Sequence, residues 1–310
     1  MGGSDAPHRD SDLDRLLEQF AELAGRPRRL EELPGGLTNR NVKVTTPDGV
    51  YVARCGSPDA GLLGIDRDNE HYNSRAAEQA GVGAPVIGYR PELGILLVGF
   101  LEGATLTNTD MQDPAVLARV AVGCRTLHSG PRFRDPFDMF ALQPAYLDVI
   151  NDNGFRLPKG YHEHAEDFQA IAQVLRATDQ NTAPCNNDLL AANFIDDGRR
   201  VWLIDYEYSG NNDPCFELGN IWAECGLSAE QLDELVTGYY GRALRHKTAR
   251  AHLQGIVGKY GWTLWGCIQS ASSTIDFDFW DWATERFESA VAEFRSPCFH
   301  RLLDEAQASD

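Results

Sequence analysis

Long apolar runs are absent from this chain of 310 residues, and no segment approaches the length of a membrane span. Residues 1–14 are polar and charged, without the apolar stretch that a secretory signal peptide needs. We therefore expect a soluble, cytoplasmic protein with no membrane partner.

Paired cysteines and internal repeats are also missing. The chain has seven cysteines, an odd number, and no C-x-x-C motif. This pattern argues against a disulfide framework and a zinc site, and it is typical of reduced thiols in a cytosolic core. With 43% hydrophobic residues, the chain can bury a large core in one large domain or in two lobes.

Basic residues are few. Lys and Arg number 28 against 46 Asp and Glu, which gives a net charge of −18. An acidic surface of this size repels phosphate backbones, so we expect no nucleic-acid partner. The same field favours a cationic substrate, but many proteins are acidic for solubility alone, so charge discriminates poorly between partners.

The most informative segment is residues 186–208, in which a polar turn joins two short apolar runs. The pattern predicts a β-hairpin with Asp188 and Asn193 before its first strand and Asp205 at the end of its second. Phosphoryl transfer from a nucleotide needs such a set, because an acidic group takes the proton of the acceptor hydroxyl and oxygen ligands hold magnesium. A lone Asp is usually a solvated surface residue, but the joint spacing favours a catalytic site.

This segment resembles the H-x-D-x4-N and I-D-[FY]-E-Y signatures of choline and ethanolamine kinases. That family belongs with the aminoglycoside phosphotransferases to the protein-kinase-like fold. The resemblance implies that Asp188 orients and deprotonates the acceptor hydroxyl. It also implies that Asn193 and Asp205 bind Mg²⁺ with help from Glu207.

The chain departs from the signature at Asn186, where the family has a histidine that mainly braces the catalytic loop. An amide can brace the loop by hydrogen bonding. Two alternatives therefore stay open: an active enzyme and a catalytically impaired binding module of the same fold.

Near the N-terminus, residues 33–44 and 50–55 predict strands with a glycine-containing turn, and Arg54 lies at the end of the second strand. Glycines let backbone approach phosphates closely, and a cation such as Arg54 can pair with them. The run G-G-L-T-N-R-N-x-K-V resembles the nucleotide-covering loop of choline kinases, which also use Arg where protein kinases keep Lys. The resemblance implies that Arg54 holds the phosphates of ATP and that Thr38 and Asn39 belong to the covering loop.

Residues 65–80 are charged and helix-forming, and Gly81 ends the predicted helix. A solvated helix face is the ordinary interpretation of such charges. In the resemblance, however, Glu70 on this helix pairs with the phosphate-binding Arg54.

Two further strands are predicted over residues 81–87 and 94–100. The following Leu101, Glu102 and Gly103 look like the hinge between lobes, where Phe100, Glu102 and backbone groups would meet the adenine. We place the domain boundary there. Residues 1–103 would form the N-terminal lobe, and residues 104–310 would form a helical C-terminal lobe with the catalytic hairpin and the acceptor pocket.

Helical periodicity predicts a packing helix over residues 13–24 and mainly helices over residues 104–183. A turn cluster at residues 209–214 precedes another helical segment. There we expect Glu217 to brace the catalytic loop. For Glu224 we expect a surface position, with the acceptor pocket as the alternative.

Four of the six tryptophans lie between residues 262 and 282. Core packing is the simplest explanation, and we accept it for Trp280. Trp262 and Trp265 are three residues apart and share one helical face, so a cage of Trp262, Trp265 and Trp282 around a quaternary ammonium group is the sharper hypothesis. Each cation–π contact with an indole contributes about 0.5 to 2 kcal/mol.

The W-x-x-W pattern and residues 282–287, which fit [YW]-A-x-x-R-F, resemble the choline-binding segments of the same kinases. A pocket tyrosine that the family carries shortly after the region of Glu224 has no evident counterpart here. The identity of the amine therefore stays open.

We conclude that the chain is an α+β enzyme with a protein-kinase-like, two-lobed fold, a β-rich N-lobe and a helical C-lobe. The resemblance implies ATP and Mg²⁺ as cofactors and transfer of the γ-phosphoryl group to choline or a similar small, cationic amino alcohol. The alternatives are a kinase for a larger hydroxylated metabolite, such as an aminosugar or antibiotic, and the impaired binding module. The sequence does not give the oligomeric state.

Overall fold

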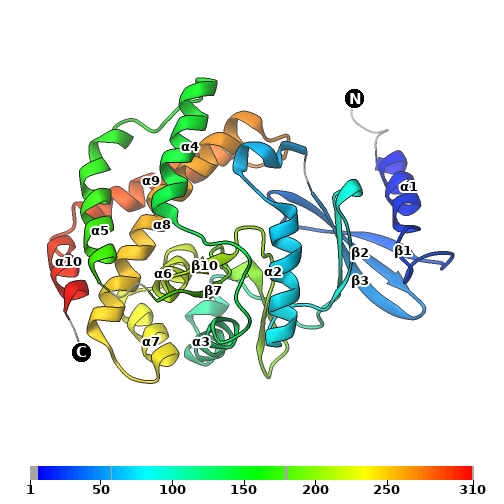
Figure 1. Ribbon diagram of the computed structural model, residues 1–310, viewed down its shortest axis with the longest axis horizontal. Coiled ribbons are helices and arrows are strands. Elements are labelled where there is room, and N and C mark those ends of the chain that lie inside the picture. Colours follow the sequence, from blue (N-terminus) through cyan, green and yellow to red (C-terminus); the bar gives the residue numbers. More distant parts are fainter. Residues whose placement is uncertain (1–5, 57, 179–180, 309–310) are drawn as a thin grey trace.

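The N-terminal part of the computed structural model is a five-stranded antiparallel sheet in the order β1-β2-β3-β5-β4 (Figure 1). The structure describes residues 6–56, 58–178 and 181–308. The strands are β1 (Arg29–Leu33), β2 (Asn39–Thr46), β3 (Gly49–Gly56), β4 (Val86–Arg90) and β5 (Ile95–Gly99). Val42, Val44 and Leu97 are buried in a small apolar core on this sheet, so the predicted strands are confirmed.

The first helix begins and ends earlier in the chain than predicted. α1 (Ala6–Leu17) ends at Leu17, and the chain continues in turns that bond Phe20 N to Leu17 O and Leu23 N to Phe20 O. Phe20 and Leu23 are nevertheless buried against the sheet. The turns keep these apolar side chains on the sheet, and Arg28 closes the segment by donating to Leu23 O.

Helix α2 (Arg67–Ala80) runs beside the sheet and faces the helical body (Figure 1). Asp66 caps its start by accepting from the backbone N–H groups of Asp68 and Asn69, and Gly81 ends it with a φ of 81°. Its Asn73 donates to the backbone oxygen of Ser209. The helix therefore connects the sheet to the C-terminal part.

The C-terminal part is mainly helical, which confirms the two-lobed α+β architecture. Its longest helix, α8 (Arg245–Ser272), packs against several neighbours (Figure 1). The other α-helices described there are α3 (Pro114–His128), α4 (Met139–Asn153), α5 (Ala165–Ala177), α6 (Pro214–Glu224), α7 (Ala229–Tyr240), α9 (Phe279–Phe294) and α10 (Phe299–Gln307). None of the helices in the described part of the chain combines the length and apolarity of a membrane span.

The predicted hairpin forms with shorter strands, β8 (Phe194–Asp196) and β9 (Val201–Leu203), and β6 (Ala104–Thr105) pairs with β8. Because β6 joins the C-terminal sheet directly after Gly103, we propose the lobe boundary at that residue.

The expected turn cluster instead contains a strand, β10 (Gly210–Asn212), which pairs with β7 (Ala183–Cys185). Gly210 also lets residues 135–137 pack against this strand, because a Cβ there would lie 2.9 Å from the Cβ of Phe137.

Helices α6 and α8 touch through their backbones. A Cβ on Gly255 would lie 2.6 Å from the carbonyl oxygen of Gly219, and a Cβ on Gly219 would overlap the carbonyl oxygen of Ala251. Only glycine at both positions allows this approach. The separation of the two helices is therefore fixed by main-chain contact.

The cysteine side chains agree with the prediction of free thiols in a core. All seven cysteines are free, and Cys124, Cys185, Cys215, Cys225 and Cys267 are buried.

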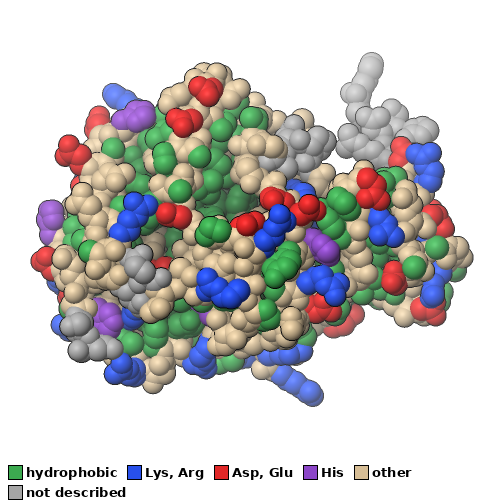
Figure 2. Space-filling model, viewed as in Figure 1, with side chains coloured by type: hydrophobic (Ala, Val, Ile, Leu, Met, Phe, Trp, Pro, Cys, Tyr) green, Lys and Arg blue, Asp and Glu red, His purple; other side chains and the backbone are tan. Residues whose placement is uncertain are grey.

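On the face shown in Figure 2, Asp and Glu side chains are interspersed with Lys and Arg side chains over both lobes. The net negative charge is therefore not gathered into one patch on that face.

Candidate active site

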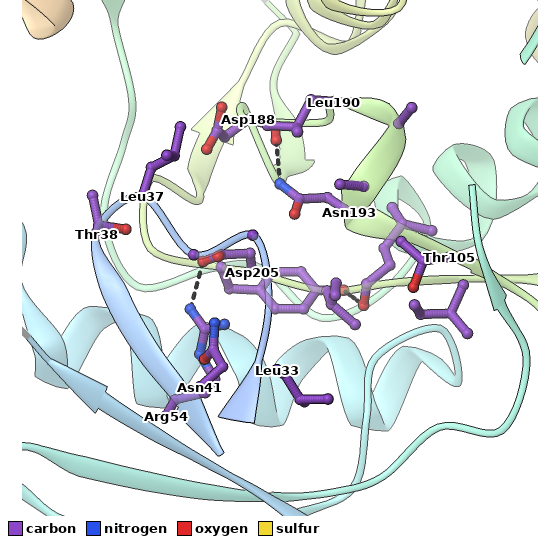
Figure 3. Close-up of a pocket in the computed structure, with 18 of the residues that line it drawn as sticks. Leu33, Leu37, Thr38, Asn41, Arg54, Thr105, Asp188, Leu190, Asn193 and Asp205 are labelled. Carbon is purple, nitrogen blue, oxygen red and sulfur yellow. Dashed lines mark hydrogen bonds and ion pairs between the residues drawn. The ribbon is translucent and has the colours of Figure 1, made fainter. Parts of the chain in front are cut away.

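A cavity of about 810 Å³ lies between the sheet and the helical body (Figure 3). Its wall includes Leu33, Thr38 and Arg54 from the N-terminal part, and Asp188 and Asp205 from the C-terminal part. Residues from both ends of the chain therefore meet in one space.

The three polar groups of the central segment converge in this cavity. Asn193, at the end of the turn η5 (Ala191–Asn193), donates from Nδ2 to the backbone oxygen of Asp188 at 2.7 Å. Its amide oxygen therefore points away from that loop, on the side of Asp205 (Figure 3). Carboxylate and amide oxygens are the ligands that Mg²⁺ prefers, so Asn193 and Asp205 fit a magnesium ion.

The backbone around these groups has an uncommon conformation. In the described part of the chain, Asn187 (φ 70°) and Asp205 (φ 64°) are the only residues other than glycine with positive φ. Such a conformation is uncommon for residues with a side chain and needs support from the surroundings. Both positions lie within the predicted catalytic segment.

Asn186 supplies part of that support. Its Nδ2 donates to the backbone oxygens of Ile204 at 3.1 Å and Asp205 at 2.7 Å, and its Oδ1 accepts from the N–H of Asp188 at 3.1 Å. The amide therefore ties the loop of Asp188 to the loop of Asp205.

Glu217 braces the same loop from helix α6. Its buried carboxylate accepts the N–H groups of Asn186 at 3.2 Å and Asn187 at 2.7 Å. The ring of His128 lies between this carboxylate and another side chain, with Nε2 at 3.2 Å from Oε1 of Glu217 and Nδ1 at 2.8 Å from the hydroxyl of Tyr239. These contacts agree with the expected bracing role of Glu217.

Asp188 lies in an electrostatic setting that disfavours its charge. Burial raises the pKa of Asp188 well above its ordinary value, and the carboxylates of Asp205 and Glu224 raise it further. A carboxylate with raised proton affinity is suited to accept a proton from a hydroxyl group.

Arg54 pairs with Glu70, as the resemblance implied, and also with Asp205. Its Nη2 lies 3.0 Å from Oε1 of Glu70. The same atom lies 2.6 Å from Oδ1 of Asp205 (Figure 3). Burial opposes the charge of Arg54, but the carboxylates of Asp205, Glu70 and Glu207 outweigh it and raise the pKa.

The other residues expected around the nucleotide divide into two groups. Thr38 and Phe100 line the cavity. Asn39 and Glu70 are buried and are not part of its wall, whereas Glu102 is exposed and also lies off the wall. The neighbours of Glu102, Leu101 and Gly103, do line it.

Glu207, expected as a further metal ligand, also lies behind the wall. Its Oε2 accepts from Nη1 of Arg67 at 2.8 Å and from the amide of Asn39. Burial raises the pKa of Glu207, and the neighbouring Asp205 and Glu70 raise it further. No sequence pattern singled out Arg67, because its charge is one of several on the predicted helix.

The predicted cage residues line the same cavity as Asp188. The rings of Trp265 and Trp282 meet edge to face, with centroids 5.3 Å apart, and a tyrosine, Tyr208, meets Trp262 in the same way at 5.1 Å. Sequence reasoning missed Tyr208 as a pocket residue, although it ends the I-D-[FY]-E-Y motif.

Two of the three indoles in the cage donate their N–H groups to partners within the protein. Trp262 donates to Oδ1 of Asn220 at 3.1 Å, and Trp265 donates to the hydroxyl of Tyr208 at 2.8 Å. Trp280, assigned to packing, does not line the cavity, and the guanidinium of Arg156 lies 3.6 Å from its ring centroid.

Glu224 is not a surface residue, contrary to our expectation. Its side chain lines the cavity, is only 7% exposed, and accepts from Nε of Arg286 at 3.1 Å and Nη2 at 2.7 Å. The guanidinium of Arg286 also lies 4.7 Å from the ring centroid of Trp282. The expectation failed because the partner of Glu224 lies 62 residues further along the chain.

Comparison with known proteins agrees with this arrangement. The model of the choline/ethanolamine kinase family matches residues 30–235. Protein LicA of Haemophilus influenzae is 27% identical over 268 residues, which cover 83% of this chain and 77% of LicA. Ethanolamine kinase 2 of Rattus norvegicus is 26% identical over 252 residues, which cover 72% of this chain and 64% of that protein.

A solved structure extends the similarity to almost the whole fold. The crystal structure of a choline/ethanolamine kinase family protein from Mesorhizobium loti has a TM-score of 0.85 and 32% sequence identity, and the match covers 96% of this chain and 99% of that one. The family match spans the sheet, helix α2 and the central hairpin. The chain therefore belongs to the choline/ethanolamine kinase family.

Proposed function

We propose that this protein, an ATP-dependent small-molecule kinase by its family, transfers the γ-phosphoryl group of ATP to the hydroxyl of choline or a similar small amino alcohol. The observation that carries the proposal is the position of Asp188 in one cavity with the four rings of Tyr208, Trp262, Trp265 and Trp282. An ethanolamine kinase among the relatives supports an acceptor of this class.

In this proposal, Asp188 orients the acceptor hydroxyl and takes its proton. Arg54 holds phosphate oxygens of the nucleotide, and Glu70 keeps the guanidinium in place. Asn193 and Asp205 would hold Mg²⁺, which would neutralise charge on the phosphates. Most of the rate enhancement comes from positioning and electrostatics, because the protein forms no covalent bond with the group transferred.

The aromatic residues would bind the cationic head of the acceptor. The N–H groups of Trp262 and Trp265 are engaged in hydrogen bonds within the protein, so what these two residues offer the acceptor is ring surface. Ring surface attracts a quaternary ammonium, which has no N–H to donate. Glu224 brings a carboxylate to the same wall, but Arg286 neutralises it. This combination favours choline over a primary amine.

A coupled ADP-release assay with choline, ethanolamine and other amino alcohols tests the proposal. We expect turnover with choline, and a Trp265→Ala variant should raise the KM for choline by roughly 2- to 30-fold. The KM for ethanolamine should change much less. Equal changes for both substrates would contradict the cage.

The same assay separates the alternatives. Turnover only with an aminosugar or antibiotic would show that the protein is a phosphotransferase but that its acceptor is not a small amino alcohol. Nucleotide binding without any product would indicate the impaired binding module. The three hydrogen bonds of the Asn186 side chain argue against that alternative, because they support the loops of Asp188 and Asp205. We also propose a cytoplasmic location, which the free thiols support.

A further inference from the structure

At the cavity wall and directly behind it, three carboxylates lie close enough to share one cation. Glu70, Asp205 and Glu207 can each offer an oxygen within 4.8 Å of the other two. The side chains of Glu70 and Glu207 are only 4% and 3% exposed. Three buried or partly buried negative charges at this separation require positive charge nearby.

The protein supplies that charge itself. Arg54 bridges Asp205 and Glu70, and Nη1 of Arg67 bridges Glu70 at 2.6 Å and Glu207 at 2.8 Å. The two guanidinium groups therefore alternate with the three carboxylates. Burial opposes the charge of Arg67, but Glu207 and Glu70 outweigh it and raise the pKa.

The position of Arg67 is set by these carboxylates and not by a full set of hydrogen bonds. Its Nε and Nη2 are buried and have no partner among the described residues. Leaving such donors unpaired is unfavourable, so the contacts through Nη1 must compensate. Gly56 makes room for the group, because a Cβ there would lie 3.1 Å from Nε of Arg67.

We propose that Arg67 takes the place of a second metal ion in this kinase. Its guanidinium holds Glu70 and Glu207 as a fixed pair and keeps Glu207 from binding metal. One divalent cation then remains, at Asn193 and Asp205. Arg67 is a positioning residue, because it acts through Glu70, the partner of Arg54. This inference rests on the proposed phosphotransferase function.

Counting bound Mn²⁺ by electron paramagnetic resonance, with a non-hydrolysable ATP analogue at saturation, tests the inference without turnover. We expect one Mn²⁺ per chain in the parent and two in Arg67→Met, because the substitution frees Glu70 and Glu207. Arg67→Lys, which keeps a charge, and the exposed control Arg199→Met should both bind one. Two ions in the parent, or one in a folded Arg67→Met, would overturn the inference.

A second pair of variants covers the case in which Arg67→Met does not fold. Glu207→Gln should leave the Kd for Mn²⁺ within about twofold of the parent, whereas Asp205→Asn should raise it at least tenfold. Equal weakening by both would show that Glu207 is a ligand and would refute the inference. Absence of kinase activity toward every amino alcohol would refute the proposed function alone, since the ion count needs no acceptor.

Discussion

Nη2 of Arg54 lies 2.6 Å from Oδ1 of Asp205, and this contact joins the two lobes across the cavity. Arg54 lies on strand β3, and Asp205 follows strand β9. Their side chains are 11% and 23% exposed, so the pair is largely shielded from water. The proposed phosphate-binding cation and the proposed metal ligand thus neutralise each other, and binding of Mg²⁺ and ATP has to weaken their contact.

Replacing Arg54 with Met should destabilise the protein by about 3 kcal/mol, because Glu70 and Asp205 lose a buried partner. The KM for ATP should rise as well. Urea denaturation and steady-state kinetics measure the two effects. Arg54→Lys should lose less stability, and equal stability of Arg54→Met and the parent would contradict the importance of the pair.

An Asp188→Asn variant should lower kcat by about 10²- to 10⁴-fold, the usual contribution of a positioned base. The KM values for ATP and choline should change little, because the amide keeps the shape of the side chain. The exposed Glu288→Gln serves as a matched control. A variant as fast as the parent would exclude Asp188 as the base.

The raised pKa of Asp188 predicts how its stability effect depends on pH. The folded protein binds this proton more tightly than the unfolded chain does, so the stability from protonation is present at low pH and is lost as pH rises through the folded pKa. Asp188→Asn should therefore stabilise the protein at neutral and alkaline pH, and the gain should shrink as pH falls. Denaturation midpoints of parent and variant at several pH values test this sign, and a gain confined to acidic pH would contradict it.

Arg286→Met should change the substrate preference. It leaves the carboxylate of Glu224 without its partner on the pocket wall, where a primary ammonium could donate to it. A hydrogen bond between charged groups contributes about 1.5 to 3 kcal/mol. We therefore expect the kcat/KM ratio of ethanolamine to choline to rise at least tenfold, while the exposed Arg301→Met leaves it unchanged. An unchanged ratio in Arg286→Met would show that Glu224 does not influence the acceptor.

Variants at Asn186 test whether the amide fully replaces the family histidine. Asn186→Ala removes three hydrogen bonds, and at about 1 kcal/mol each this should cost about 3 kcal/mol of stability and reduce kcat. Asn186→His should leave kcat within about threefold, because the existing amide already ties both loops. A large gain in rate with histidine would instead show that the natural site is impaired.

The features that the sequence predicted are mostly local. The spacing from Asp188 to Asp205 lies within one hairpin, and Trp262 and Trp265 share a helical face because they are three residues apart. Short-range periodicity and turn residues carry such information. The convergence of these residues on one cavity followed from the family resemblance.

The features that the sequence did not predict depend on contacts between distant elements. The buried position of Glu224 depends on its ion pair with Arg286 from another helix, and that of Glu207 depends on its ion pair with Arg67 from the other lobe. The end of α1 at Leu17 had the same origin, because packing on the sheet favoured turns over continued helix. Local propensity contains none of these pairings.

The contact between Gly219 and Gly255 has a consequence for the length of the acceptor. Helix α6 carries Glu217, which anchors the loop of the base, and helix α8 carries Trp262 of the cage. Since the two main chains already touch, neither helix can yield to bring base and cage nearer together. The minimum number of carbons between hydroxyl and nitrogen is then set by rigid main chain, and for an amino alcohol that is one methylene too short the two helices cannot move closer to compensate.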